Sequence, residues 1–411
     1  MNNGYLKSYF KGIIVKKLSA VEIMPRKSNQ HEFNATRGMR VLFGEEDRKY
    51  KATFLYIDDE QSFSAEEYLT WYDARRNHPT RTEYRLYYPS TQVSQSAAEG
   101  DSLFICVKQD ETLLCIVSQK ESTITSQLYW LFDINPSNAD HFIENDKLET
   151  DGNQLEFTVK TILGQIGIEY EYHSDETLLD SLMATFGTAF PKTEVFSAYA
   201  RSLVKDADPE SEPDKTLMRW YDQEEKLFYL MEKQIVKERL KQGFGCGTDV
   251  DVDGFISYSL SVQNRRKSRA GLAFENHIAA LFDANKIAYT HTPVTENHSK
   301  PDFLFPDIKC YFDKSFPTSW LTVLGAKSTC KDRWRQVLSE AERISQKHLI
   351  TFEAAISKYQ TDEMRDKKLQ LVVPKSIHGT YTMEQRQWLY SVEQFLSEIK
   401  EKQNYYEKYT G

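Results

Sequence analysis

The hydrophobic pattern of the chain differs between its two halves. From residue 10 to about residue 170, short runs of apolar, β-branched and aromatic residues alternate with turn residues, a pattern that predicts β-strands. Many short strands with few helical stretches favour a barrel or a sandwich, so we expect an all-β N-terminal domain. The expected strands lie at 12–15, 40–44, 50–56, 103–107, 113–117 and 128–132.

A helical pattern begins after an acidic, proline-containing loop at 206–214. Apolar residues recur at helical spacing along one face of 217–240, and the glycine-rich stretch from Gly243 is expected to end this helix. A second helix is expected after a basic run at 264–271, because apolar residues from Phe274 onward return at i, i+4, i+7 and i+8.

The last third of the chain alternates apolar runs with helical patterns, an order that predicts mixed α/β layers. Glu275, just behind the basic run, is expected as an acid in the first turn of its helix, where the helix dipole favours it. The remaining strands are expected at 303–305, 320–327 and 369–374, and the remaining helices from Trp334 and from Met383 onward.

Length and composition indicate an ordinary globular protein of two domains. The chain has 411 residues, of which 40% are apolar and 27% are charged. It is too long for one compact core and too apolar for a disordered chain. The formal net charge of −9 provides no overall basic footprint, so any nucleic-acid surface must be a local basic cleft.

Cysteine spacing and hydropathy predict a cytoplasmic protein without membrane association. The five cysteines are scattered and show no Cys-x-x-Cys spacing, so we expect reduced thiols rather than disulfides or a zinc site. The N-terminus lacks the apolar core of a leader peptide, and no apolar run reaches the roughly 18 residues of a membrane span.

Two segments combine basic and polar side chains that suit contacts with DNA. The run at 264–271 is either a solvated surface or an electrostatic footprint for phosphate. The segment at 72–85 is either a solvated edge strand, whose charges prevent aggregation, or a set of contacts to phosphates and base edges. The candidate DNA-binding residues in these segments are Arg265, Arg266, Lys267, Arg269, Arg81, Glu83 and Arg85.

Three residues could together hydrolyse a phosphodiester. Asp302 precedes one expected strand, Lys327 ends the next, and Glu340 is expected on the following helix. The reaction requires a metal held by carboxylates, an attacking water and a positive group near the developing charge. Asp302 and Glu340 can ligate Mg²⁺, which prefers oxygen ligands, and Lys327 can stabilise charge or position the water. Each residue alone is ordinary, so only the combination indicates a nuclease.

Long strings in the second half closely resemble the EcoRII family of restriction endonucleases. The first half resembles this family more weakly, through the stretch at 16–20, which contains Lys17, and the loop at 80–83. The strings that carry the resemblance are Asn-Arg-Arg-Lys-Ser-Arg-Ala-Gly at 264–271, Lys-Pro-Asp-Phe-Leu-Phe-Pro at 300–306, Lys-Asp-Arg-Trp-Arg-Gln at 331–336 and Leu-Val-Val-Pro at 371–374.

The resemblance implies two domains with different roles. Residues 1–174 would form an effector-binding pseudobarrel, and residues 175–411 a nuclease domain of the PD-(D/E)xK type. The N-terminal domain, with Lys17 among its DNA contacts, would bind a second copy of the DNA site and restrain cleavage until that copy is bound. Such coupling of two sites is allostery.

The resemblance also assigns catalytic residues. In the common form of the motif an acid stands two residues before the lysine, but here Gly325 occupies that place. The resemblance implies a variant in which the acid lies on the following helix, and Glu340 matches it. Glu275 matches a further family carboxylate, and Tyr311 matches a tyrosine close to the active site.

A charged cluster after the lysine can read bases. Lys331 and Arg333 can donate to guanine O6 and N7, and Asp332 can accept from cytosine N4. The resemblance implies that this cluster reads the outer CC and GG of a short, nearly palindromic site, CCWGG-like or CCNGG-like. A homodimer through the C-terminal domain would match the two half-sites. The alternative is a charged helix start.

Enzymes of this family extrude the central base pair, and a loose alignment points to Arg219, Trp220 and Tyr221 as the residues that stack on it. Aromatic and guanidinium planes can replace the lost stacking. A core aromatic at a helix start is the alternative interpretation of these residues.

The sequence therefore predicts a Mg²⁺-dependent type II restriction endonuclease that cuts double-stranded DNA as a homodimer and binds two or more copies of its site. One alternative is a sequence-specific DNA-binding regulator with an inactive nuclease-like domain. Another is a nuclease that cuts only damaged or modified DNA.

Overall fold

The computed structural model of the chain describes residues 5–23, 31–136, 140–144, 156–168, 175–246, 249–330 and 333–410. The chain divides into two compact units, Met1–Gln154 with Val159–Glu169 and Leu155–Thr158 with Tyr170–Gly411. Each unit has its own hydrophobic core. The roles predicted for 1–174 and 175–411 are not tested by this division.

One mixed sheet of eight strands dominates the N-terminal unit, in the order β2-β5-β4-β3-β7-β6-β1-β8. Neighbouring strands are antiparallel except β3 and β7, which run parallel. The sheet bends around a core that includes Trp71, Leu86 and Phe54, as expected for a half-barrel. Its strands are β1 (Phe10–Lys17), β2 (Glu32–Asn34), β3 (Arg48–Ile57), β4 (Ser62–Asp73), β5 (Tyr84–Tyr87), β6 (Ser102–Lys108), β7 (Leu113–Ser118) and β8 (Asp140–Glu144).

Two of the expected strands in this unit are helices, so those two predictions were wrong. The run at 40–44 lies largely within α3 (Arg37–Phe43), and the run at 128–132 lies largely within α5 (Thr123–Leu131). Thr36 and Ser122 cap these helices with their side-chain oxygens, a signal that outweighs a short apolar run. The other helices here are α1 (Tyr5–Tyr9), α2 (Ala20–Ile23), α4 (Gln92–Ser96) and α6 (Glu156–Gln165).

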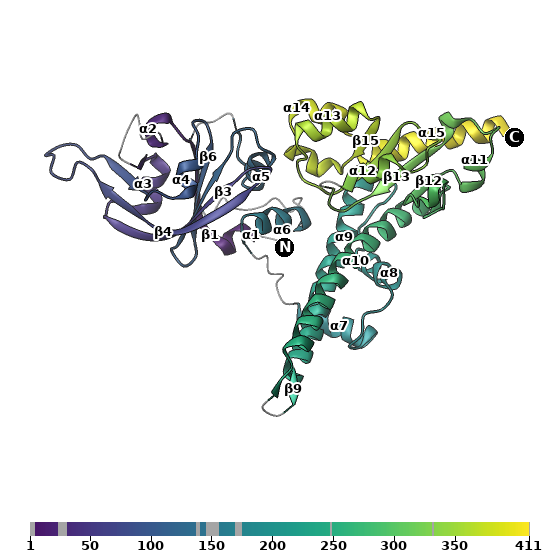
Figure 1. Cartoon of the computed structure of the whole chain (residues 1–411), viewed down its shortest axis with the longest axis horizontal. Helices are drawn as coiled ribbons and strands as arrows, with labels where there is room; N and C mark the ends of the chain where they lie inside the picture. The colour runs from purple at the N-terminus through teal and green to yellow at the C-terminus, as the bar shows by residue number, and fades with distance from the viewer. Residues whose placement is uncertain are drawn as a thin grey trace. The chain divides into compact units, whose positions relative to one another are not determined.

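Long helices form one part of the C-terminal unit, where Figure 1 shows α9 (Pro213–Gln242) and α10 (Val252–Ala284) side by side. Gly243 ends α9 with φ 75°, as predicted. The basic run at 264–271 lies inside α10 rather than before it, and Glu275 is therefore not in a first turn. Shorter helices α7 (Glu176–Phe186) and α8 (Thr193–Leu203) precede them, and β9 (Gly245–Cys246) pairs with β10 (Asp249–Val250) between them.

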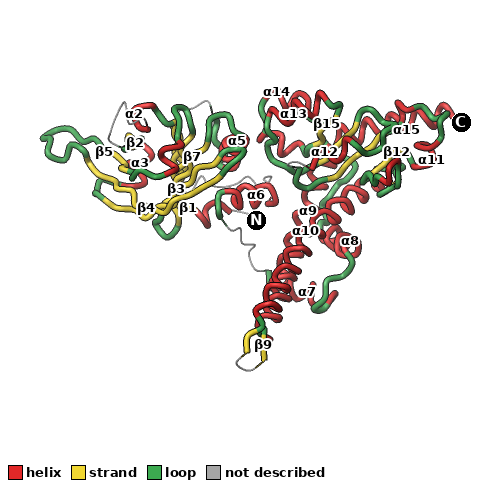
Figure 2. Tube along the Cα trace, viewed as in Figure 1, coloured by secondary structure: helices red, strands yellow, loops and turns green. Residues whose placement is uncertain are grey.

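A five-stranded sheet forms the other part, in the order β11-β12-β13-β14-β15. Figure 2 shows its strands β12 and β15 in yellow, with helices around them in red. β11 to β13 are antiparallel, whereas β13, β14 and β15 are parallel. The sequence interpretation missed β14, whose apolar run is very short. The strands are β11 (Thr290–His291), β12 (Phe303–Phe305), β13 (Thr322–Ala326), β14 (Lys347–Ile350) and β15 (Leu369–Val372), and the helices around them are α11 (Ile308–Phe312), α12 (Trp334–Leu338), α13 (Lys358–Asp366), α14 (Met383–Trp388) and α15 (Val392–Thr410).

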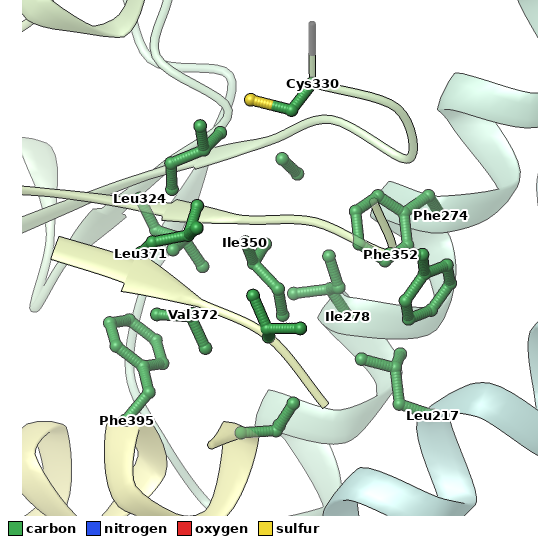
Figure 3. Close-up of a cluster of buried hydrophobic side chains, with 14 of the residues drawn as sticks. Leu217, Phe274, Ile278, Leu324, Cys330, Ile350, Phe352, Leu371, Val372 and Phe395 are labelled. Atoms are coloured by element: carbon green, nitrogen blue, oxygen red, sulfur yellow. The ribbon is translucent and has the colours of Figure 1, made fainter. Parts of the chain in front are cut away.

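The core of this unit joins the sheet to the long helices. Figure 3 shows Leu324, Ile350 and Leu371 of three neighbouring strands together with Phe274 and Ile278 of α10. Strands covered by helices carry apolar side chains on both faces, which explains the short, fully apolar runs that predicted them. Among the described residues, no helix is long and apolar enough to cross a membrane.

Candidate active site

The pairing of β12 with β13 brings the first two candidate catalytic residues together. Phe303 pairs with Leu324 in an antiparallel register, so the residue before β12 lies beside the end of β13. There the Oδ2 atom of Asp302 accepts hydrogen bonds from Lys327 Nζ at 2.7 Å and from the Ala326 amide at 2.6 Å. The sheet register therefore fixes the carboxylate by a backbone contact as well as an ion pair.

Both partners of this ion pair are mostly withdrawn from solvent. The side chain of Lys327 is 19% exposed and that of Asp302 is 14% exposed. The backbone amide of Lys327 donates to Ile350 of β14 at 3.0 Å. A buried charge that lost its partner would be costly, so each of these two side chains holds the other in its position.

Glu340 lies in a turn rather than on a helix. We expected the helix from Trp334 to continue past this residue, but α12 ends at Leu338. Ala341, the next residue, has φ 48°, which is incompatible with helix continuation. The ammonium of Lys347 donates to the carbonyl oxygens of Glu340, of Ala341 at 3.0 Å and of Ile344 at 2.9 Å. Lys347 is only 6% exposed, so a buried side chain stabilises this turn.

The electrostatics of Glu340 suit a cation site. Burial and the nearby charge of Asp302 raise the pKa of Glu340 to about 7, against the opposing effects of Lys327 and Lys347. Its Oε2 atom is buried and accepts no hydrogen bond from the described residues. A buried carboxylate oxygen without a donor, close to a second carboxylate, is a suitable ligand for a divalent cation.

The site offers two carboxylates, those of Asp302 and Glu340, as donors to a divalent cation. Among the described residues, no group of three His, Cys, Asp or Glu side chains is placed to hold a metal ion. Mg²⁺ keeps several waters and uses one or two protein carboxylates, which Asp302 and Glu340 could provide. The residues present therefore fit a hydrated hard cation.

The structure explains why no acid stands two residues before the lysine. Gly325 is on β13, and a Cβ atom built there would lie 2.6 Å from Cγ2 of Val337 on α12. Any side chain at position 325 would therefore collide with this helix. The turn after the same helix carries Glu340, whose pKa the charge of Asp302 helps to raise. Close packing of α12 on β13 thus excludes the usual acid and brings another one near.

Tyr311 contacts the segment that follows Glu340. Its hydroxyl donates to both carboxylate oxygens of Glu296, at 2.8 and 2.6 Å, and accepts from the Arg343 amide at 3.3 Å. Burial and Glu296 raise the pKa of Tyr311 well above its usual value. The phenol therefore remains protonated and acts as a donor. Glu296 was not singled out from the sequence, because an acid in an exposed-looking loop gave no signal.

Glu275 reaches the sheet through a histidine. Its Oε2 atom lies 3.1 Å from Nε2 of His291 on β11. The His291 ring stacks on Phe303 with centroids 4.9 Å apart, and Thr292 donates its amide to the Asp302 carbonyl at 2.9 Å. Glu275 is thus linked to the strand that begins after Asp302, but no contact joins its carboxylate to that of Asp302 among the described residues.

The base-reading cluster is only partly described. Lys331 and Asp332 lie outside the described residues. Arg333 is exposed and donates from Nη2 to the carbonyl and hydroxyl oxygens of Thr329, at 2.8 and 2.9 Å. The Cys330 amide donates to Glu353 at 2.9 Å, so the segment before the cluster is anchored to the unit.

Three of the four basic DNA-binding candidates at 264–271, which the structure places on α10, make contacts within the C-terminal unit. Arg266 pairs with Glu232 at 2.5 Å, Arg265 lies over the ring of Phe190 at 5.2 Å, and Arg269 donates to the Pro191 carbonyl at 2.9 Å. Lys267 is exposed. These contacts give the three arginines structural roles, and their DNA-binding role stays a prediction.

The candidate DNA-binding residues of the N-terminal unit differ in whether their side chains are exposed or held in ion pairs. Lys17 and Arg81 are exposed. Arg85 bridges Glu83 and Glu32, both at 2.5 Å, and Glu83 also pairs with an arginine at position 75. The hydrogen bond from Arg85 is the main cause that lowers the pKa of Glu83 to about 2. The segment at 72–85 is therefore an organised ion network, which suits either interpretation of it.

The proposed base-stacking residues belong largely to the core. Trp220 is 7% exposed and Tyr221 is 1% exposed, and the ring of Tyr221 packs edge-on against Phe274 and Phe352. Arg219 pairs with Asp206 at 2.5 Å. A ring that stacks on an extruded base must offer an accessible face, and in this conformation neither aromatic does. The alternative interpretation, a core aromatic, describes both rings.

Comparisons with known proteins match the second half of the chain. Residues 228–396 match the family model described as EcoRII C terminal. The chain is 40% identical to the type II restriction enzyme EcoRII of Escherichia coli over 212 residues, an alignment that spans 51% of this chain and 50% of that enzyme. The chain thus spans about half the length of this relative, and the resemblance to the EcoRII family is confirmed for that part.

Two solved structures of restriction endonucleases with DNA are also similar. One is metal-depleted Ecl18kI with uncleaved, modified DNA, at 16% identity and a TM-score of 0.46, covering 56% of this chain and 84% of that chain. The other is a complex of the restriction endonuclease PspGI with substrate DNA, at 16% identity and a TM-score of 0.40, covering 56% of this chain and 92% of that chain.

Proposed function

From the match of residues 228–396 to the EcoRII C-terminal family model, we propose that the chain is a Mg²⁺-dependent type II restriction endonuclease that makes double-strand breaks in DNA. The observation that carries this proposal is the arrangement of Asp302, Lys327 and Glu340. One carboxylate is fixed by its ion pair, and the other has a raised pKa and a buried oxygen without a donor.

Each residue of the site would have a separate role in hydrolysis. Asp302 and Glu340 would hold the metal, which when bound supplies Lewis-acid stabilisation of charge on the phosphate and a more acidic water. Lys327, held against Asp302, brings a positive charge to the side of the site where charge develops in the transition state. Tyr311 remains protonated and, through Glu296 and Arg343, supports the segment after Glu340.

Specificity would come from the cluster that follows Lys327. We infer that Lys331, Asp332 and Arg333 read the CC and GG ends of a short site, because their donors and acceptor match the major-groove edges of G·C pairs. A homodimer through the C-terminal unit would present two copies to the two half-sites and provide one active site for each strand.

The N-terminal unit would bind a second copy of the site and restrain cleavage until it is occupied. Exposed Lys17 and Arg81 and the ion network around Arg85 suit contacts to phosphates and base edges. This regulation predicts that the C-terminal unit alone, starting near residue 175, cuts DNA with a single site faster than the full chain does.

Cleavage of a plasmid of known sequence that carries several copies of each candidate CC/GG-flanked site tests the proposal, because the second copy relieves the proposed restraint. The full chain with Mg²⁺ should produce discrete ends, and sequencing of these ends should reveal one CC/GG-flanked site. Lys327→Ala should bind the same DNA but cut it at least ~10²-fold more slowly, because a charge near the transition state is removed. Specific binding without cleavage by the wild-type chain would instead indicate a DNA-binding regulator, and cleavage that survives Lys327→Ala would contradict the assigned site.

A further inference from the structure

The end of β14 and the residues just after it hold the segment that follows β13. The carbonyl of Ile350 accepts a hydrogen bond from the Lys327 amide at 3.0 Å. Three residues later, Oε2 of Glu353 accepts from the Cys330 amide at 2.9 Å. One strand end therefore positions both the backbone of the candidate catalytic lysine and the backbone three residues beyond it.

Glu353 is buried, and its own backbone is held by two side chains. The residue is 9% exposed. Its amide donates to the Thr351 hydroxyl at 3.1 Å, and its carbonyl accepts from the Tyr381 hydroxyl at 2.7 Å. A hydrogen bond from an amide to a carboxylate is stronger than one to a neutral acceptor. Because the carboxylate stands on a fixed backbone, it limits where the Cys330 amide can lie.

Cys330 connects Glu353 to Arg333. Its amide donates to Glu353, and its carbonyl accepts from the Arg333 amide at 2.8 Å. The side chain of Cys330 is fully buried in the core of this unit (Figure 3), and so is that of Trp334, the residue after Arg333. The backbone at Arg333 is thus held on both sides, whereas its side chain is exposed. An exposed side chain on a fixed backbone suits the reading of a base edge.

We propose that Glu353 is a positioning residue for base reading, which fixes, through Cys330, the backbone from which Arg333 extends. This inference rests on the proposed function, in which Arg333 donates to the guanine of an outer base pair. Without an acceptor at position 353, the buried Cys330 amide would lack a partner. The segment would move to find another one, and Arg333 would move with it. A site with a wrong outer pair should then be rejected less strongly.

Partial digestion of a plasmid in the presence of Mg²⁺ measures this discrimination. The plasmid carries several copies of the CC/GG-flanked site and of sites in which one outer G·C pair is replaced by A·T. Sequencing of the fragment ends counts the cuts at both kinds of site in one reaction, and the ratio of the counts compares the two kcat/KM values.

Replacement of the buried acid should change this ratio. Glu353→Met, which keeps the length of the side chain but has no acceptor, should lower the ratio about tenfold, the size of one good base contact. Glu353→Gln, which keeps an acceptor oxygen, should stay within about twofold of the wild type. Thr351→Val removes the hydroxyl that accepts from the Glu353 amide and should lower the ratio about threefold. This milder variant decides the matter if Glu353→Met does not fold.

A double variant tests whether Glu353 acts through Arg333. Arg333→Met should lower the ratio by a similar factor, and adding Glu353→Met to it should lower the ratio no further. Glu398→Met serves as the control, because Glu398 lies 3.8 Å from His348, near the start of β14 rather than its end. This control should lower stability and leave the ratio unchanged.

Thermal melting identifies the variants that are folded. An unchanged ratio in folded Glu353→Met, an equal fall in Glu398→Met, or a further fall in the double variant would overturn the inference. These outcomes leave the proposed function intact, because the wild type still cuts at its site. A wild-type chain that does not cut, or that cuts without regard to the outer pairs, would contradict the proposed function and this inference with it.

Discussion

Asp302 and Glu340 carry the same chemical group, but different kinds of structure hold them. Asp302 lies at a strand end, where register, a backbone amide and Lys327 fix it. Glu340 lies in a turn after a five-residue helix, where the buried Lys347 holds the carbonyls around it. Burial and the charge of Asp302 raise the pKa of Glu340 to about 7. The comparison teaches that the sheet register fixes the position of the Asp302 carboxylate, whereas packing around the turn fixes the position of Glu340.

Replacement of Lys347 should have the largest effect on stability. It should disturb the turn that carries Glu340 and leave the strand end that carries Asp302 unchanged. Lys347→Met keeps the length of the side chain but removes the donor that three carbonyls share, of which that of Ala341 still accepts from the Ile344 amide. We therefore expect a loss of about 2–4 kcal/mol in the free energy of unfolding. The freed turn should also weaken metal binding at Glu340. Urea denaturation measures the first effect, and the Mg²⁺ concentration for half-maximal cleavage measures the second.

A purely structural role of Lys347 would lower stability without changing the metal requirement. We therefore compare Lys402→Met, which removes a lysine that pairs with Glu398 on α15 at 2.7 Å, away from the turn. This variant should leave the Mg²⁺ requirement unchanged. An equal Mg²⁺ requirement in Lys347→Met, in Lys402→Met and in the wild type would remove the positioning role.

Gly325→Ala should have the next largest effect. The added methyl group would lie 2.6 Å from Val337, so α12 must shift and the protein should lose about 1–3 kcal/mol of stability. Since the turn with Glu340 follows this helix, cleavage should fall as well. The double variant Gly325→Ala with Val337→Ala should recover part of both losses. Additive losses in the double variant would argue against the packing explanation.

Glu340→Gln should change stability in a pH-dependent way. The folded pKa is about 7, above the ordinary value of 4.5 for a glutamate, so the folded carboxyl keeps its proton to higher pH than the unfolded one. The wild type without metal should lose stability as pH rises from 4.5 to 7. After discounting for partial exposure, the variant should be about 1–2 kcal/mol more stable than the wild type at pH 8 and equal to it near pH 4.5. Chemical denaturation at both pH values measures this, and parallel pH profiles would contradict it.

The sequence could predict that Asp302 and Lys327 lie together at the ends of two strands. It could not predict the turn that holds Glu340. Asp302 and Lys327 each border an apolar run that forms a strand, and pairing of neighbouring strands then brings them together. The position of Glu340 depends on where α12 stops, and this follows from the turn at Ala341 and from Lys347 on the unforeseen β14. These contacts join residues only three to seven positions apart, but a turn at a non-glycine residue and a buried lysine that binds carbonyls follow no periodic pattern of apolar and polar residues.

The same contrast holds for the rest of the chain. The long helices were predicted because many turns repeat one pattern, whereas the short apolar runs at 40–44 and 128–132 fit a strand and a helix equally well. The caps at Thr36 and Ser122 decided between them. Trp220 and Tyr221 could not be separated from surface aromatics by sequence, because their burial depends on contacts with distant elements.

Metal binding by calorimetry tests the shared carboxylate site most directly. At pH 7, Mg²⁺ binding to the full chain should release about half a proton, because Glu340 is half protonated there and must lose its proton to ligate the ion. Titrations in buffers of different ionisation enthalpy measure this proton release, which should fall to near zero at pH 9 and in Glu340→Gln. Equal binding enthalpies in all buffers at pH 7, or unchanged proton release in Glu340→Gln, would contradict the account.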